Sequence, residues 1–145
     1  MTYREKLAKM REARPEPVMV PFVLDDELFH VDVRKLDGMD WAAVTADALP
    51  VTALDHRLGF STIRAALLAC EKYSTLHDAE QVPVPEEWEK GEKIPTDWRG
   101  IFDEISEEEL NAIAALWWGM NSRDPNRRAG ELKKALAGGG KTSLS

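Results

Sequence analysis

The residues that could carry out chemistry are few in this chain, and their spacing favours neither a catalytic nor a metal site. None of the three histidines, His30, His56 and His77, has a second ligand placed as in the patterns that bind zinc. The single cysteine, Cys70, excludes an internal disulfide, and its apolar surroundings predict a buried, unreactive thiol. We therefore expect no catalytic residue, no cofactor and no metal ligand.

Two acidic runs and one glycine-rich run have ordinary structural explanations. Residues 25–27 (DDE) lack the spaced ligands and the glycine of an EF-hand loop, and a hairpin turn explains them better. Residues 107–109 (EEE) fall at a predicted helix N-terminus, where the helix dipole favours negative charge. The run ALAGGGKT at 135–142 resembles a phosphate-binding loop, but that chemistry needs a preceding strand, and a helix is predicted there.

Composition and charge exclude several classes of protein. With 145 residues, 43% of them hydrophobic and 31% charged, the chain fits one globular domain rather than a disordered segment. Residues 1–14 carry five basic and two acidic side chains, and residues 122–145 carry six and two. The middle, 15–121, therefore holds 8 basic against 22 acidic side chains and a net charge of −14. This balance argues against a nucleic-acid or anionic-membrane binder.

The chain also shows no targeting signal. Its apolar stretches fall short of the roughly 20 residues that span a bilayer. The charged start, MTYREKLAKMREAR, lacks the apolar block of a signal peptide. We therefore expect a protein that stays in a cytoplasm and does not enter a membrane.

The first third of the chain predicts a helix and a hairpin. Apolar residues at helical spacing predict a basic helix over 1–14, stopped by prolines. Two β-branched and aromatic runs around a polar pair predict a β-hairpin over 18–33, and Pro21 indicates that its first strand lies at a sheet edge. Because His30 and Asp32 alternate with apolar residues, we expect one face of the second strand to be wet.

From residue 38 onward the pattern is helical. Residues 82–95, rich in proline, form a predicted loop pinned by one aromatic, Trp88. Five helices are predicted. The first runs from an Asp40 cap through Leu49, the second covers 63–73 after Ser61 or Thr62, and the third runs from Thr96-Asp97 through Phe102. The fourth covers 110–120 after a Ser106 cap, and the last covers 127–137.

These elements predict an α+β fold, mostly helical, with an N-terminal β-hairpin. We expect a single globular domain over 1–137, helical over 38–137, and a disordered C-terminal tail over 138–145. The residues expected in the core repeat at strand or helix periods: Phe29, Val31, Ile63, Leu67, Phe102, Ile113, Leu116 and Trp117.

The five tryptophans are the most unusual feature of the composition. Trp41, Trp98 and Trp117 fall on predicted apolar helix faces, so we expect them in the core. Trp118 lies about 100° around the helix from its neighbour, and Trp88 lies in the predicted loop. Since tryptophan is enriched at interface hot spots, Trp118 and Trp88 are our candidate protein-binding residues.

The order of elements resembles a known family. It is carried by VDVRKLDGMDW at 31–41, LGFSTI at 58–63, TDWRGIFD at 96–103 and an Asn after the last core helix at 120–121. Over roughly 15–125 the chain resembles the tail assembly chaperones of long-tailed, siphovirus-type bacteriophages, chiefly those of actinobacteria. The shared features are the spacing of the hydrophobic residues, two Asp-Trp pairs and Asn121 after the last core helix.

The resemblance implies a protein without enzymatic activity, made late in infection in the host cytoplasm and absent from the mature virion. Its implied partner is the tape measure protein, which it binds while the tail tube assembles. Further candidate partners are the tail tube protein, further copies of the chain, and a longer form made by ribosomal frameshifting, for which Gly140-Lys141 fits a slippery codon run. Two alternatives stay open: a structural virion component such as a head–tail adaptor, and a small acidic regulator of a host protein.

Overall fold

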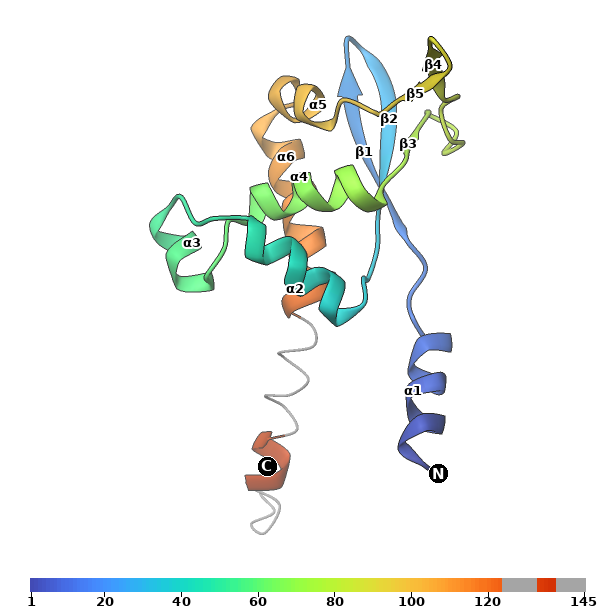
Figure 1. The fold of residues 1–145 in the computed structure, drawn as a ribbon. Helices are drawn as coiled ribbons and strands as arrows, with labels where there is room; N and C mark the ends of the chain where they lie inside the picture. Colours follow the sequence, from blue (N-terminus) through green and yellow to red (C-terminus); the bar gives the residue numbers. More distant parts are fainter. Residues whose placement is uncertain (124–132, 138–145) are drawn as a thin grey trace.

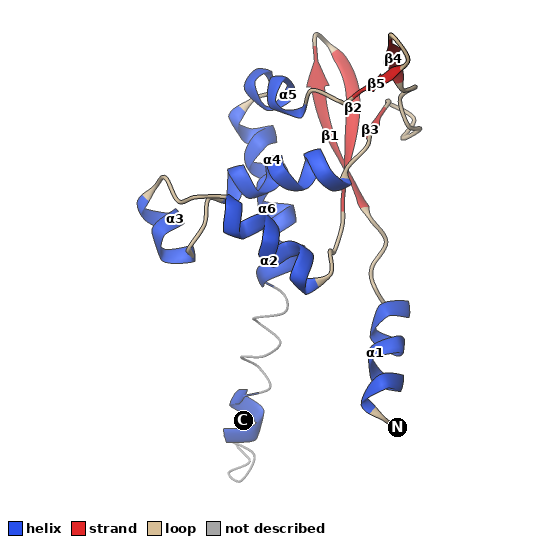
Figure 2. Ribbon diagram, in the orientation of Figure 1, coloured by secondary structure: helices blue, strands red, loops and turns tan. Residues whose placement is uncertain are grey.

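The chain has an α+β fold, seen in a computed structural model that describes residues 1–123 and 133–137 (Figure 1). Helices surround one side of a three-stranded sheet (Figure 2). In chain order the elements are α1 (Tyr3–Glu12), β1 (Val18–Leu24), β2 (Glu27–Val33), α2 (Gly38–Asp47), α3 (Ala53–Leu58), α4 (Thr62–Tyr73), β3 (Leu76–His77), β4 (Glu87–Glu89), β5 (Glu92–Ile94), α5 (Trp98–Glu104), α6 (Glu107–Trp118) and the π-helical turn η1 (Gly119–Arg123).

The predicted N-terminal hairpin is confirmed. Strands β1 and β2 pair antiparallel, and Asp25 and Asp26 form the turn with φ of +48° and +64°. This left-handed pair matches the right-handed twist of the flanking strands, so the hairpin closes in two residues. Strand β3 pairs with the other side of β2, which leaves β1 at the sheet edge, as Pro21 predicts.

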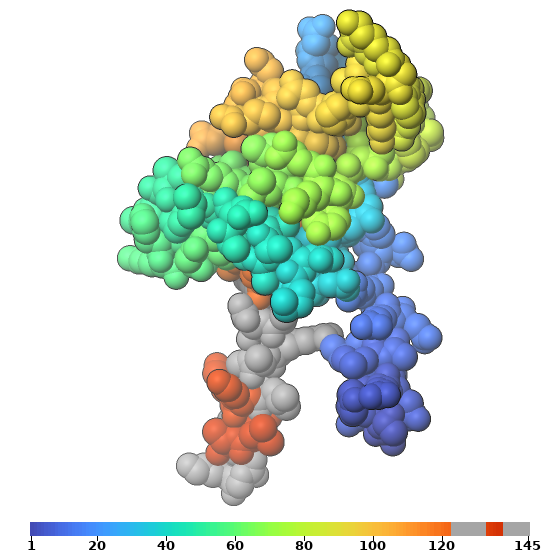
Figure 3. Space-filling model, viewed as in Figure 1, coloured from blue at the N-terminus to red at the C-terminus, as the bar shows by residue number. Residues whose placement is uncertain are grey.

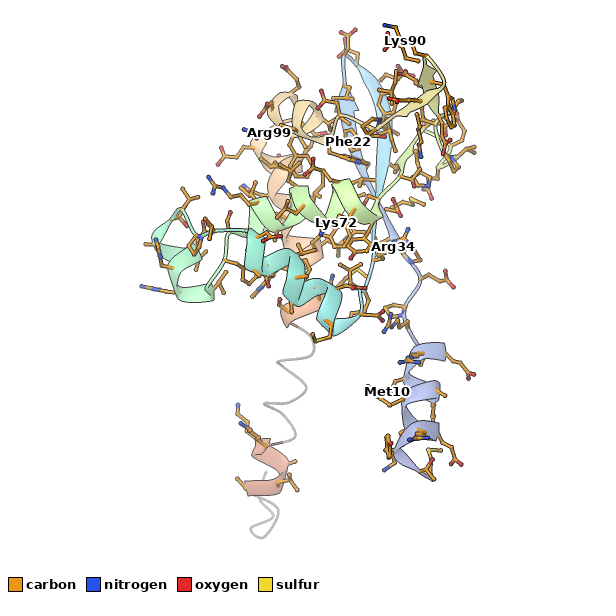
Figure 4. The ribbon with its side chains drawn as sticks, in the orientation of Figure 1. Met10, Phe22, Arg34, Lys72, Lys90 and Arg99 are labelled. Atoms are coloured by element: carbon orange, nitrogen blue, oxygen red, sulfur yellow. The ribbon has the colours of Figure 1, made fainter. Side chains whose placement is uncertain are left out.

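The core lies between the sheet and helices α4 and α6. Phe22 projects from β1 toward these helices (Figure 4). The fully buried side chains of helix α4 are all small: Ala65, Ala66, Ala69 and Cys70. Small residues let helix backbones approach closely, and this explains how a short α4 packs against α2, α5 and α6, while α6 contacts the sheet.

Most of the predicted core is confirmed. Four of the predicted residues are buried and three are half-buried against the core, and only Ile63 is 38% exposed. Ile63 stands on the first turn of α4, which begins on the side away from the sheet (Figure 1), so the prediction for this residue is wrong. The buried residues are Val31, Phe102, Ile113 and Trp117, and the half-buried ones are Phe29, Leu67 and Leu116.

The three tryptophans expected in the core are buried there. Trp41 stacks on Trp117 with ring centroids 6.5 Å apart, and Phe60 meets Trp41 edge-on at 6.0 Å. The indole N–H of Trp41 donates to Ser122 Oγ at 2.6 Å, so its polar end is also satisfied. Trp98 is buried beneath the N-terminus of α5, which Asp97 caps as predicted.

Both predicted boundaries of helix α2 are wrong, and the helix predicted over 110–120 runs from Glu107 to Trp118. Helix α2 begins at Gly38 after Asp37, so Asp40 lies in its first turn and does not cap it. The same helix ends at Asp47, because the chain leaves helical geometry at Ala48, and Leu49 therefore lies beyond it. Leu49 is exposed as a consequence.

The stretch expected to be helical after residue 38 contains three short strands. Residues 82–95 include the hairpin β4–β5, which turns at Lys90 and Gly91 with φ of +52° and +81°. Trp88 is 62% exposed on this hairpin, so the expectation that it pins a loop is wrong. Of the last predicted helix, residues 133–137 are helical, and 127–132 lie outside the described residues, as does the predicted tail at 138–145.

Candidate protein-binding surfaces

Among the described residues, helix α1 stands apart from the sheet and from helices α2–α6 (Figure 3), and none of its ten residues is buried. Tyr3, Leu7 and Met10 share one side at helical spacing, and each is exposed. Thr2 and Glu5 form a complete capping box at the start of the helix. The apolar side of this amphipathic helix is therefore left uncovered by the part of the chain that the structure describes.

The base of α1 is tied to the body by an ion pair. The Arg14 guanidinium lies 2.5 Å from an Asp37 carboxylate oxygen, at the point where α2 begins. The hydrogen bond and the charge of Arg14 lower the pKa of Asp37. This contact fixes where the linker between α1 and β1 leaves the body.

A second apolar surface surrounds α3. Leu49, Val51 and Leu54 are each at least 60% exposed within six residues of sequence. We call these three side chains the α3 surface. Scattered exposed leucines are common, but three large apolar side chains on one short segment are a feature of surfaces that bind proteins.

The α3 surface is held in place by a buried carboxylate. Asp55 Oδ2 accepts the backbone N–H groups of Val51 and Thr52, each at 3.0 Å, and the Thr52 hydroxyl accepts the N–H of Asp55. These hydrogen bonds, that from the Thr52 backbone foremost, lower the pKa of Asp55 against the effect of burial. The loop that carries Val51 is therefore ordered before any partner binds.

An open hollow of about 460 Å³ lies between α2 and the C-terminal end of α3. Its apolar walls come from Trp41 on α2 and from Leu58 and Phe60 at the end of α3. The hollow is open to solvent rather than enclosed, so it suits side chains of a protein partner better than a small ligand, which binds in enclosed clefts.

The two candidate protein-binding tryptophans lie in different environments. Trp88 projects from β4 and is exposed, flanked by Glu87 and Glu89. Trp118, at the end of α6, is half-buried beside the fully buried Trp117. The structure does not bring the two candidates into one cluster, and their role in binding stays a prediction.

The expected wet face of β2 is wrong. His30 and Asp32 are 6% and 2% exposed, because residues 74–78 fold over this face. Asp32 Oδ1 accepts the N–H of Thr75 at 2.7 Å, and His30 Nδ1 lies 2.8 Å from the carbonyl oxygen of Asp78. Strand β2 is therefore buried on both faces: its apolar side chains face the core, and its polar side chains face residues 74–78.

This polar cluster is built as a structural network. His77, the cross-strand neighbour of His30, places Nδ1 2.8 Å from the Thr75 carbonyl oxygen and 4.0 Å from Asp32 Oδ1. Arg34 forms an ion pair with the same carboxylate. Both imidazoles direct Nδ1 at backbone oxygens, so they donate there, and the cluster ties β3 to the sheet.

Three candidates for chemistry remain: the Cys70 thiol, a metal-binding cluster and the glycine-rich run at 135–142. Burial raises the pKa of the Cys70 thiol to about 12, so the thiol is un-ionised at neutral pH, as expected. Within residues 1–123 and 133–137, no three His, Cys, Asp or Glu side chains are grouped to hold a metal ion. The glycines and lysine of the 135–142 run lie outside the described residues.

The α3 surface was missed from the sequence, although a signal for it exists. Thr52 and Asp55 have the spacing of a capping box, and Gly59 provides the left-handed residue (φ +90°) that ends a helix. The helix between these two signals has six residues, which is too short to show a hydrophobic periodicity.

Comparisons with protein-family models, with curated protein sequences and with solved structures each found no match. Among the described residues, no helix has the length and apolar character needed to cross a membrane.

Proposed function

We propose that this chain is a phage tail assembly chaperone, which binds the tape measure protein and supports tail tube assembly without catalysing a reaction. Support comes from the resemblance of residues 31–41, 58–63 and 96–103 to that family, and from the order of these segments along the chain. The proposed setting is the host cytoplasm, with the finished virion lacking the chain.

The observation that carries the proposal is the α3 surface. A chaperone must offer apolar side chains to its client while it stays folded and soluble by itself. Leu49, Val51 and Leu54 are exposed along the segment that leads from the end of α2 into α3, and Asp55 orders the backbone of that segment. A client helix supplies apolar side chains at i, i+3, i+4 and i+7, which fit such a surface.

Charge supports solubility and the encounter with a client. The net charge of −14 over residues 15–121 keeps the folded chain soluble and attracts basic segments of a client. Apolar contacts then supply most of the affinity. We therefore expect salt to weaken client binding only in part.

Copurification tests the proposal. The tagged chain is coexpressed with the tape measure protein encoded in the same viral genome, and the recovered complex is quantified at low and high salt. We expect a complex that Leu54→Asp reduces at least tenfold, while Val82→Asp, a matched change at another exposed site, leaves it intact. If no complex forms at low salt, the proposal is wrong.

The composition of purified virions separates the chaperone from the alternative of a structural component. A chaperone is present in lysates during assembly and absent from mature particles. Recovery of the chain in stoichiometric amount from particles would instead make it a virion component, such as a head–tail adaptor.

A further inference from the structure

Residues 86–95, which contain β4 and β5, form an arm that projects from the body (Figure 1). The base of the arm is held to the main sheet, because the backbone of residues 82–84 pairs with that of residues 76–78 through two hydrogen bonds of 2.8 Å. Beyond this base, none of the six residues in β4 and β5 is buried. Lys90, in the turn, marks the outer end of the arm (Figure 4).

Local features of the chain keep the arm ordered. A two-stranded hairpin is marginally stable in water by itself, so its order requires other support. The prolines at 83, 85 and 95 flank the arm and reduce the conformational entropy that is lost when it folds. The turn residues Lys90 and Gly91 have the positive φ values of a tight hairpin turn. The arm is therefore formed before a partner binds, with its strand residues left uncovered.

The two faces of the arm differ in charge. Cross-strand neighbours share a face, and successive residues of a strand alternate between the faces. Trp88, 62% exposed, lies opposite Lys93 on one face. Ile94, 40% exposed, shares the other face with three glutamates, and we call this the acidic face. The glutamates of the acidic face are Glu87, Glu89 and Glu92.

Among the described residues, no ion pair includes the three carboxylates of the acidic face. Glu89 and Glu92 are direct cross-strand neighbours, and like charges in this arrangement destabilise a hairpin. On the other face, Lys93 Nζ already lies 2.9 Å from a Glu86 carboxylate oxygen. The acidic face therefore keeps a repulsion that a cationic partner would relieve.

The chemistry of the arm specifies the kind of partner that fits it. No three His, Cys, Asp or Glu side chains in the described part of the chain could hold a metal ion, so the cation comes from another source. The carboxylates would repel a nucleic acid or an anionic membrane. Lysine and arginine side chains supply a cation on an apolar stem, and arginine also stacks on an exposed tryptophan such as Trp88. The arm therefore fits a basic segment of a protein.

An open hollow of about 400 Å³ on the arm shows that this segment should also carry apolar residues. It is lined by two apolar, two acidic and two basic residues: Ile94, Pro95, Glu89, Glu92, Lys90 and Lys93. An apolar side chain of the partner can contact Ile94 there, while a neighbouring cation of the partner meets a carboxylate of the acidic face.

From these observations we infer that the arm is a second client contact, which selects a segment of the tape measure protein that carries lysine or arginine beside apolar residues. This inference rests on the proposed function. The α3 surface supplies apolar contacts, and the arm distinguishes one client segment from another, since complementary charge gives specificity more than affinity. Figure 1 shows α3 and the arm on opposite sides of the body, so a client that contacts both is held at two points.

Overlapping peptides that cover the tape measure protein encoded in the same viral genome test this selection. The labelled full chain is applied to the peptides, and fluorescence polarisation gives the affinities of those that bind. We expect the bound peptides to carry lysine or arginine next to apolar residues. Glu87→Lys combined with Glu89→Lys should weaken their binding about tenfold, and the variant should instead bind peptides that carry aspartate or glutamate.

Glu12→Lys combined with Glu71→Lys is the matched control, because it changes the net charge equally at exposed sites outside the arm. This control should bind the same peptides as the original chain. A new preference for acidic peptides also separates the arm variant from one that has merely unfolded, and circular dichroism checks the fold of both variants.

The inference is overturned if the bound peptides have no excess of basic residues, or if the arm variant and the control bind the same peptides. It is also overturned if no peptide binds while the whole tape measure protein still copurifies with the chain. In these cases the proposed function stands. If neither the peptides nor the whole tape measure protein binds, the proposed function and the inference are both wrong.

Discussion

The carboxylate of Glu109 accepts the backbone N–H of Val23 at 2.7 Å, joining two residues that lie 86 positions apart. Val23 belongs to the edge strand β1, whose neighbour Pro21 has no N–H to offer. The same carboxylate accepts the N–H of Ser106 at 3.0 Å and so caps α6. One side chain therefore starts the last core helix and closes part of the sheet edge, where unpaired donors would invite another strand.

Glu109→Ala should lower the free energy of unfolding by about 1–3 kcal/mol, because it removes a helix cap and a charge-assisted hydrogen bond to the sheet. Glu108→Ala is the matched control, since Glu108 is exposed and should cost less than half as much. Urea denaturation of the two variants gives the comparison. Equal losses would mean that the bond to Val23 contributes nothing measurable.

The stability added by Glu109 should depend on pH in a defined direction. Hydrogen bonds from Ser106 and then Val23 lower the pKa of Glu109 below its ordinary value of 4.5. A lowered pKa stabilises the fold fully above the ordinary value, and the stabilisation is lost as the pH falls through the folded-state pKa. The difference in stability between the original chain and Glu109→Gln should therefore be constant near neutrality and shrink below about pH 4.5. A difference that grows on acidification would contradict this assignment.

Local signals predicted much of this fold, and contacts between distant segments account for what was missed. The capping box at Ser106 and the two-residue turn at Asp25-Asp26 lie within a few residues of sequence, so α6 and the hairpin were predictable. The burial of His30 and Asp32 depends on residues 74–78, more than 40 positions away, and no alternation pattern reports it.

The candidate surfaces were harder to predict than the core. Leu49 is exposed because α2 ends two residues before it, whereas the helix was predicted to run through Leu49. Trp88 stands on a hairpin whose turn, Lys90-Gly91, lies within a proline-rich stretch that favours a loop. Leu49 and Trp88 therefore lie where the local pattern is ambiguous, and their exposure depends on boundaries that the pattern does not define.

Burial distinguishes two isoleucines that the sequence treats alike. Ile113→Ala should lower the free energy of unfolding by about 2–5 kcal/mol, because the side chain is fully buried between α6 and its neighbours. Ile63→Ala should cost less than about 1 kcal/mol, because Ile63 is partly exposed at the start of α4. Thermal or urea denaturation measures both. A large loss at Ile63 would indicate that the first turn of α4 packs more tightly than described.

The candidate tryptophans can be tested in the complex with the client. Trp88→Ala and Trp118→Ala should each weaken tape measure binding by more than about 1 kcal/mol, because truncation of a tryptophan anchor removes a large apolar contact. Trp88 is exposed, so its variant should keep its melting temperature, whereas Trp118 is half-buried and requires a stability measurement alongside. Unchanged affinity in both variants would restrict client binding to the α3 surface.

The most direct measurement of the central claim is the solubility of the tape measure protein. The fraction of that protein in the soluble lysate is compared after expression alone, with the original chain, and with the Leu54→Asp variant. A chaperone predicts a soluble fraction that rises severalfold with the original chain and returns toward the uncomplexed level with the variant. Equal aggregation in all three cultures would contradict the account.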